Sequence, residues 1–209
     1  MAKVVPALLS STKSDYEHDL AVVRQLTDRF QLDIIDGQFV DNETVSLNQL
    51  DKTPGLKMDI HLMVTDPIAC IREALKLSPN LVIFQYEGSS AVPQAINELK
   101  QNGQRVGLAI NPSTTIDKIK PLLSELDHLL VMMYPAGFAG QKFEPVNLDK
   151  ISQARDIRPD LEIGIDGGVN QSSIKQIASA KPDIVNVNSY LFSAEDVASR
   201  YSELMEAFK

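Results

Sequence analysis

The amino-acid sequence predicts an α/β fold, a single (β/α)8 TIM barrel with eight parallel strands that takes up residues 1–209 as one domain. Eight short apolar runs alternate with stretches of helical spacing, and the repeat of about 25 residues fits a barrel slightly below the usual size. The runs are rich in β-branched residues, Leu or Met, as is typical of strands buried on both faces. A chain of 209 residues can also bury enough surface to fold without disulfides or metals.

The expected elements follow one another in regular alternation. The expected strands are residues 4–9, 32–35, 58–63, 81–84, 106–110, 129–133, 162–165 and 184–187. The expected helices are residues 16–30, 67–77, 93–102, 146–158 and 194–208. Asp66 before Pro67 predicts a helix start, and Asn102 before Gly103 predicts a helix stop. The connection 41–57 is polar and irregular, with at most a short helix near Leu47.

A doubly wound open sheet is the alternative architecture. It usually has fewer strands and a glycine-rich phosphate turn after the first strand. Here the first strand leads into Ser10, Ser11 and Thr12 instead. The barrel is therefore favoured.

The composition excludes some classes of partner. A net charge of -8 and a pI near 4.9 argue against nucleic acid, which is bound by clustered Lys and Arg. No apolar run reaches the roughly 18 residues of a membrane-spanning helix, so no membrane partner is expected. The single cysteine, Cys70, and the absence of a recognisable signal segment predict a cytoplasmic location. A small anionic substrate is compatible with this charge, since backbone N–H groups hold small phosphates.

The second strand carries a candidate catalytic acid. Barrel enzymes place their chemical groups at the C-terminal ends of strands. The period of two puts Gln31, Asp33 and Ile35 on one face, so Asp33 is a carboxylate flanked by apolar residues. A turn-capping role suits Asp36 better, because it precedes Gly37. We interpret Asp33 as a functional acid.

The third strand carries a histidine that lies late in the strand, beside the strand that offers Asp33. Histidine with carboxylates is the usual ligand set for a divalent transition metal. His61 is therefore expected to contact a metal or the substrate. His18, in a helix, and His128, where a strand begins, are expected on the surface.

Glycines follow the sixth and seventh strands. Asp166 precedes Gly167 and Gly168, which gives an acid at the barrel mouth and a backbone that a ligand can approach closely. The loops after strands seven and eight usually form the phosphate site of this fold, and Gly167, Gly168 and Ser189 are positioned for it. The glycine-rich segment 134–141 is interpreted as a flexible loop that folds over bound substrate.

Six short motifs occur in order along nearly the whole chain. They are Pro6-Ala7-Leu8-Leu9-Ser10, Gln31-Leu32-Asp33-Ile34-Ile35-Asp36-Gly37-Gln38-Phe39-Val40, Asp59-Ile60-His61-Leu62-Met63, Ile110-Asn111-Pro112-Ser113-Thr114, Ala136-Gly137-Phe138-Ala139-Gly140-Gln141 and Asp166-Gly167-Gly168-Val169. In order and spacing this set resembles the ribulose-phosphate 3-epimerase family, which shows Pro-Ser-Ile-Leu-Ser, His-x-Asp-x-Met-Asp-Gly-x-Phe-Val, Asp-x-His-Leu-Met, Leu-Asn-Pro-x-Thr, Pro-Gly-Phe-Gly-Gly-Gln and Asp-Gly-Gly-Val.

The resemblance implies a (β/α)8 isomerase that inverts the carbon beside the ketone of ribulose or xylulose 5-phosphate. Asp33 and Asp166 would act as the two acids on opposite faces of the substrate, through an enediolate stabilised by a divalent metal, Zn, Fe or Mn. Asp33, His61 and Asp166 match the metal ligands. The resemblance carries substrate or phosphate contact to His61, Met63, Met132, Gly137, Phe138, Ala139, Gly140, Gly167, Gly168, Asn188 and Ser189.

Several departures from the family pattern fall at the expected site. Gln31 stands where the family has its first metal-binding His, and an amide oxygen is the weaker ligand for zinc or iron. The other departures are Ala7 for Ser in the opening motif, Ile35 for a pocket Met, Gln85 for a frequent His, Pro135-Ala136 for Asn-Pro and Asn188-Ser189 for Gly-Ser. The barrel residues match the family pattern better than the residues of the expected site do.

Three functions remain open on this basis. The first is a 3-epimerase acting on a pentulose or hexulose phosphate. The second is a catalytically silent barrel that binds sugar phosphates. The third is a related barrel lyase, against which the third strand speaks because 59–64 contains no lysine. Barrels of this kind often associate through apolar helix faces, so a homo-oligomer is left open.

Overall fold

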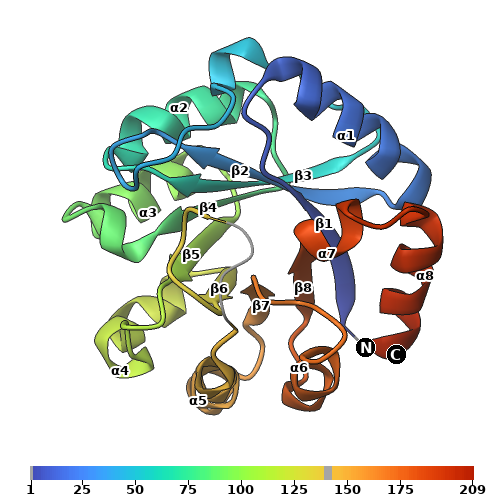
Figure 1. Ribbon diagram of the computed structural model, residues 1–209. Coiled ribbons are helices and arrows are strands. Elements are labelled where there is room, and N and C mark those ends of the chain that lie inside the picture. Colours follow the sequence, from blue (N-terminus) through green and yellow to red (C-terminus); the bar gives the residue numbers. More distant parts are fainter. Residues whose placement is uncertain (1, 139–142) are drawn as a thin grey trace.

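The eight strands of a computed structural model, which describes residues 2–138 and 143–209, close into one all-parallel barrel (Figure 1). The order around the barrel is the order along the chain, and β1 closes the ring by pairing with β8. The strands are β1 (Lys3–Leu8), β2 (Arg29–Ile35), β3 (Lys57–Met63), β4 (Leu81–Gln85), β5 (Val106–Ile110), β6 (His128–Met132), β7 (Glu162–Asp166) and β8 (Ile184–Val187). All eight expected strands are confirmed.

Helices surround the barrel (Figure 1). They are α1 (Lys13–Leu26), α2 (Pro67–Lys76), α3 (Val92–Gln101), α4 (Ile116–Ile119), α5 (Asp149–Ile157), α6 (Ile174–Ala180), α7 (Ser189–Phe192) and α8 (Val197–Ala207). Short 3-10 turns are η1 (Leu47–Gln49), η2 (Tyr86–Gly88), η3 (Lys120–Glu125) and η4 (Pro145–Leu148). None of the described helices is long and apolar enough to span a membrane.

Capping residues account for the helix ends that the sequence predicts well. The Asp66 carboxylate accepts a hydrogen bond from the backbone N–H of Ala69, and Pro67 is the first residue of α2. α3 ends at Gln101, after which Gly103 adopts a φ of 64°. The short helix expected near Leu47 is η1. These boundaries are local, so the sequence suffices to place them.

The expected helix 16–30 is too long at its C-terminal end. α1 stops at Leu26, and Arg29 and Phe30 already belong to β2. Their spacing continues the helical pattern, but Phe30 is fully buried in the strand and Arg29 turns into the barrel. The sequence pattern gives no bounds for the short helices α4, α6 and α7, because their apolar patterns span too few residues to be distinctive.

The core has two parts, one between strands and helices and a smaller one inside the barrel. Inside, the inward-facing residues of alternate strand positions pack together and fill the lumen. This inner cluster consists of Ile35, Met63, Leu81, Ile83, Ala109, Leu130, Met132 and Ala136. The filled middle separates two polar ends, a mouth at the C-terminal ends of the strands and a floor at their N-terminal ends.

The floor of the barrel is a network of paired charges in which Arg29, Asp59 and His128 are buried. The Arg29 guanidinium donates to Asp59 at 2.6 Å and to Glu162 at 3.1 Å. Arg105 donates to Glu162 at 3.2 Å, and the His128 imidazole Nδ1 lies 2.9 Å from the same carboxylate. We refer to Arg29, Asp59, Arg105, His128 and Glu162 as the floor cluster.

The expectation that His128 lies on the surface is wrong. Its side chain is 1% exposed, because the register pairs His128 with Glu162 and turns both inward. His18, on α1, is exposed as expected. The exposure of a histidine at the start of a strand therefore depends on which strand pairs with it.

Candidate functional site

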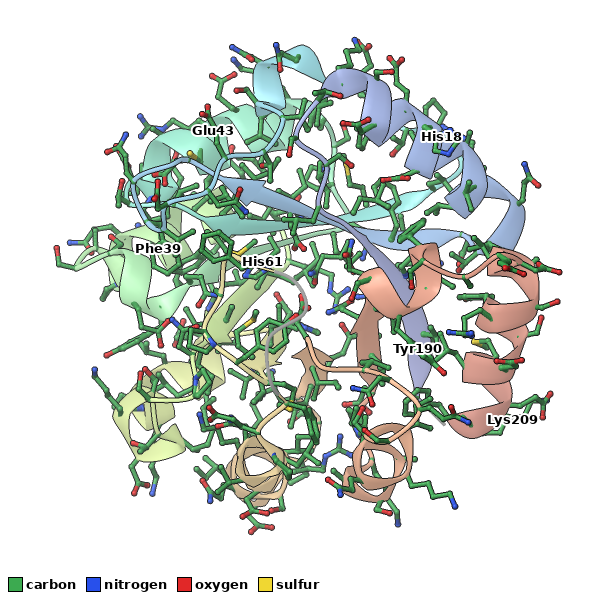
Figure 2. The ribbon with its side chains drawn as sticks, in the orientation of Figure 1. His18, Phe39, Glu43, His61, Tyr190 and Lys209 are labelled. Carbon is green, nitrogen blue, oxygen red and sulfur yellow. The ribbon has the colours of Figure 1, made fainter. Side chains whose placement is uncertain are left out.

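Three of the predicted residues meet at the mouth of the barrel. Asp33 on β2 and His61 on β3 are direct register partners, and Asp166 is the last residue of β7. One ligand atom from each of these side chains lies within 4.8 Å of the other two. Figure 2 shows His61 near the centre of the barrel, whereas His18 lies on the outer ring. The sequence therefore identified a trio that the closure of the barrel brings together.

Gln31 links the two carboxylates of this trio. Its amide nitrogen donates to Asp33 Oδ1 at 2.8 Å and to Asp166 Oδ2 at 2.5 Å. The His61 imidazole Nδ1 lies 3.1 Å from the same Asp33 oxygen. Within the described part of the chain, the buried Gln31 Oε1 has no hydrogen-bond partner. Gln31 is thus inside the site, with its nitrogen rather than its oxygen toward the carboxylates.

The surroundings of Asp166 shift its proton affinity. Burial, followed by the negative charge of Asp33, raises the pKa of Asp166 from its ordinary value of 3.8 to about 7. His61 and the hydrogen bond from Gln31 act in the opposite direction and do not cancel the effect. A carboxyl group with such a pKa can both accept and release a proton near neutral pH.

A cavity of about 270 Å³ adjoins the trio at the ends of β7 and β8. It is lined by Tyr134, Asp166, Gly167, Gly168, Val169, Asn170, Asn186, Val187, Asn188, Ser189, Tyr190 and Ser193. Gly167 has a φ of 92°, and a Cβ there would lie 2.5 Å from the Tyr134 ring. Only glycine fits at this position, where the buried backbone of Gly167 lines the cavity. The predicted residues Gly167, Gly168, Asn188 and Ser189 all line this cavity.

A smaller pocket of about 30 Å³ lies beside the cavity, next to Asp33 and His61. Its walls are Leu9, Asp33, His61, Met63, Met132, Tyr134, Gly137, Phe138, Asp166 and Asn188. Tyr134, Asp166 and Asn188 border both spaces. The predicted residues Met63, Met132, Gly137 and Phe138 therefore lie beside the acids, and the two spaces together form an elongated site.

Two asparagines form hydrogen bonds with Ala136 and Gly137, in the loop that follows β6 (the β6 loop). Asn42 Nδ2 donates to the carbonyl oxygen of Gly137 at 2.7 Å, and the backbone N–H of Ala136 donates to Asn111 Oδ1 at 2.9 Å. The predicted residues Ala139 and Gly140 lie outside the described residues. Asn111 belongs to a motif that the sequence displays, whereas nothing in the sequence distinguishes Asn42.

Asp36 serves the turn after β2. Its carboxylate accepts hydrogen bonds from the backbone N–H groups of Gln38, Phe39 and Thr65. Burial raises the pKa of Asp36, but these hydrogen bonds outweigh it, and the net shift is downward. The turn-capping interpretation is confirmed.

Comparisons with known proteins agree with the motifs. The sequence profile described as the ribulose-phosphate 3 epimerase family matches residues 3–192. The cytoplasmic isoform of ribulose-phosphate 3-epimerase from Oryza sativa subsp. japonica is 31% identical, over 99% of this chain and 94% of its own. The ribulose-phosphate 3-epimerase of Buchnera aphidicola is 32% identical, over 90% and 87% of the two chains.

Solved structures with lower identity share the fold. A 3-hexulose-6-phosphate synthase from Salmonella typhimurium superposes with a TM-score of 0.71 at 19% identity, over 99% of this chain and 98% of its own. A KGPDC from Streptococcus mutans gives a TM-score of 0.72 at 10% identity, over 100% and 97% of the two chains. At such identity these likenesses support the barrel alone.

Proposed function

Because this chain belongs to the ribulose-phosphate 3-epimerase family, we propose that it interconverts D-ribulose 5-phosphate and D-xylulose 5-phosphate by proton transfer at C3. One observation carries this proposal. Two carboxylates, Asp33 on β2 and Asp166 on β7, reach one point at the mouth from strands that β1 and β8 separate. Inversion of a carbon needs one group that removes a proton from one face and another that returns it to the opposite face.

The different environments of the two acids support a division of roles. Asp33 Oδ1 accepts a hydrogen bond from the Gln31 amide and lies 3.1 Å from His61 Nδ1. The raised pKa of Asp166 keeps this group protonated up to near-neutral pH. The reaction needs one acid that accepts a proton and another that donates a proton. The two acids exchange these roles in the reverse direction.

The trio also has the donor set of a divalent metal site. Two carboxylates and an imidazole, each with an atom within 4.8 Å of the others, suit Zn, Fe or Mn, so Asp33, His61 and Asp166 would hold the ion. A bound cation there supplies electrostatic stabilisation for the negative charge that develops on the substrate oxygens. Gln31 would have to turn its amide to offer Oε1 as a further ligand.

The 270 Å³ cavity would receive the phosphate end of the substrate. Gly167, Gly168 and Ser189 line it, and their backbone N–H groups would be neutral donors that suit an anion in a protein of net charge -8. Asn188 and Tyr134 border both spaces and would lie along the carbon chain. Met63 and Met132 would pack against its apolar face.

The test is incubation with ribulose 5-phosphate in deuterated water, with Zn²⁺, Mn²⁺ or Fe²⁺ added in turn. We expect xylulose 5-phosphate with deuterium at C3. Absence of both product and C3 exchange under all three metals would overturn the pentulose assignment. The same assay with a hexulose phosphate then separates a changed substrate from a lost activity.

Gln31 supports a second candidate, a barrel that binds sugar phosphates without turnover. Its amide nitrogen holds both carboxylates in the place where a cation would hold them. This candidate predicts saturable binding of ribulose 5-phosphate and no exchange at C3. Turnover that Asp33→Asn abolishes would exclude it.

A further inference from the structure

Asn186 on β8 is a buried polar residue at the mouth of the barrel. It is the register partner of Asp166 on β7 and of Val5 on β1. Register partners in parallel strands point to the same face of the sheet, so the Asn186 side chain is turned inward beside the Asp166 carboxylate. Asn186 is 2% exposed and lines the 270 Å³ cavity. It therefore lies where a bound substrate would pass.

The Asn186 amide has no internal partner. Within residues 2–138 and 143–209, neither its nitrogen nor its oxygen forms a hydrogen bond. The polar side-chain atoms of this part of the chain that are sealed from solvent and lack a partner belong to Tyr16, Gln31, His128 and Arg155. The Asn186 amide is not among them, so it opens into the cavity that it lines. A buried amide is costly without a partner, which indicates that a ligand supplies one.

The neighbouring side chains leave this amide available. Val5 has no polar side-chain atom, and Asp166 Oδ2 accepts a hydrogen bond from Gln31. Asn188, two residues further along the chain, donates its amide nitrogen to the carbonyl oxygen of Ala7 at 2.7 Å. The Asn188 nitrogen thus joins the end of β8 to β1, whereas both amide atoms of Asn186 remain free to bind.

The position of Asn186 determines which part of the substrate it meets. Asp166 borders both spaces of the elongated site, and Asn186 borders the larger one, which would receive the phosphate. Gly167, Gly168 and Ser189 follow these two strand ends in the loops. With C3 at Asp166 and the phosphate of C5 at the loops, C4 would pass Asn186. The C4 hydroxyl is the only polar group of ribulose 5-phosphate between C3 and the phosphate.

We propose that Asn186 is a specificity-determining residue that binds the C4 hydroxyl of the substrate. A hydroxyl accepts from the amide nitrogen or donates to the amide oxygen, so either orientation of the amide serves it. A phosphate oxygen only accepts, and it suits the backbone N–H groups of the loops better. The inference rests on the proposed function for the placement of the substrate. A sugar phosphate without this hydroxyl would leave the buried amide unpaired, and a site of this kind discriminates against such an analogue.

The experiment compares two ligands that the protein cannot epimerise. Ribitol 5-phosphate has no ketone, so its C3 proton is not acidic and no turnover disturbs the measurement. Calorimetry gives its dissociation constant, that of its 4-deoxy analogue and that of inorganic phosphate. We expect the wild type to bind ribitol 5-phosphate about 10- to 100-fold more tightly than the 4-deoxy analogue, because the analogue leaves a buried amide unpaired.

Asn186→Ala removes the amide. It should abolish the preference for ribitol 5-phosphate over the 4-deoxy analogue and leave the affinity for inorganic phosphate unchanged. Because the amide has no internal partner, urea unfolding should show no loss of stability. Asn186→Val fills the same space with apolar atoms and should lose the preference as well. Asn80→Ala is the matched control at the floor: Asn80 Nδ2 donates to Asp59 at 2.6 Å, so this variant should lose stability and keep the preference.

Two results would overturn the inference. One is a wild type that binds ribitol 5-phosphate and its 4-deoxy analogue equally, or binds neither. The other is a preference that persists in Asn186→Ala. Failure of the proposed function gives a different result: a protein that prefers ribitol 5-phosphate but does not epimerise ribulose 5-phosphate would defeat that function and leave the role of Asn186 standing. Epimerisation without the preference would do the reverse.

Discussion

The two ends of the barrel both contain buried charged groups, but they differ in charge balance. At the floor, Arg29 and Arg105 neutralise Asp59 and Glu162. At the mouth, Asp33 and Asp166 share one imidazole and one amide, and the described residues show no Lys or Arg bonded to either carboxylate. Burial of acids alone therefore does not mark a functional site. An uncompensated pair at the C-terminal ends of the strands is the feature on which the proposed site rests.

The difference in charge balance gives the two ends opposite responses to pH. At the floor, hydrogen bonds from His128 and Arg29 overcome burial and hold the pKa of Glu162 well below its ordinary value of 4.5. Stability from Glu162 is thus present above that value and is lost as the pH falls. At the mouth, the raised pKa of Asp166 means that stability is lost as the pH rises from about 4 to about 7.

The largest expected effect is on catalysis at the mouth. Asp33→Asn and Asp166→Asn each remove one proton-transfer group, and each should lower epimerisation by about 10²- to 10⁴-fold. The measurement is the rate of xylulose 5-phosphate formation, with deuterium exchange at C3. Asp28→Asn, which changes an exposed acid paired with Lys57, serves as control and should leave the rate unchanged. Equal rates in all three variants would contradict the assigned roles.

The next largest effect is on stability at the floor. Arg29→Met leaves Asp59 and Glu162 without their main counter-charge, and removal of one partner from a buried ion pair costs about 3–5 kcal/mol of unfolding free energy. Urea unfolding measures this loss, and the activity per folded molecule should remain. Lys57→Met breaks an exposed pair and should change stability by less than about 1 kcal/mol. A similar small change in Arg29→Met would refute the structural role of the floor cluster.

A third prediction separates the ends by pH. Asp166→Asn removes a buried group that is costly to ionise, so the variant should be more stable than wild type at pH 8 by a few kcal/mol, since one pKa unit is about 1.4 kcal/mol. The gain should be small at pH 5. Urea unfolding at both pH values, with chelator present, measures it.

Glu162→Gln should behave in the opposite manner. Its destabilisation should be large at pH 8 and should diminish in acid, where wild-type Glu162 also loses its charge. A gain in Asp166→Asn that does not depend on pH would contradict the raised pKa.

The smallest expected effect concerns the anchoring of the β6 loop at the mouth. Asn42→Ala removes the hydrogen bond to the Gly137 carbonyl and should cost about 1 kcal/mol of stability, together with a higher KM for substrate. Asn102→Ala removes a bond of 2.8 Å to the Glu98 carbonyl on the surface and is the matched control. Asn102→Ala should lower stability by the same amount as Asn42→Ala and should leave KM unchanged. An unchanged KM in Asn42→Ala would show that the anchor does not affect the site.

Much of the candidate site could be predicted from local features. Asp33 and His61 stand out because a polar residue late in an apolar strand is rare, and Asp166 because two glycines follow it. The contacts of Gln31 and Gln85 could not be predicted in this way. Gln31 meets Asp166 across 135 positions of sequence, and Gln85 meets His61 from a neighbouring strand. Such partners depend on register.

Errors in the prediction have the same origin. The helical spacing continues through Arg29 and Phe30 and predicts a helix to residue 30, whereas the helix ends at Leu26 and both residues pair and are buried in β2. The polar start of its strand predicts an exposed His128, yet the side chain lies against Glu162. In both cases a long-range partner outweighed a local pattern.

The sequence by itself determined the alternation of strands and helices, the barrel and the identity of its acids, because apolar periodicity and short motifs act over a few residues. The tertiary structure decided which polar side chains meet. Closure of the ring brings Glu162 beside Arg29 at one end and Asp166 near Asp33 at the other, where the described residues place no Arg or Lys on either carboxylate. Charge balance is a property of neighbours in space, and only the folded chain defines those neighbours.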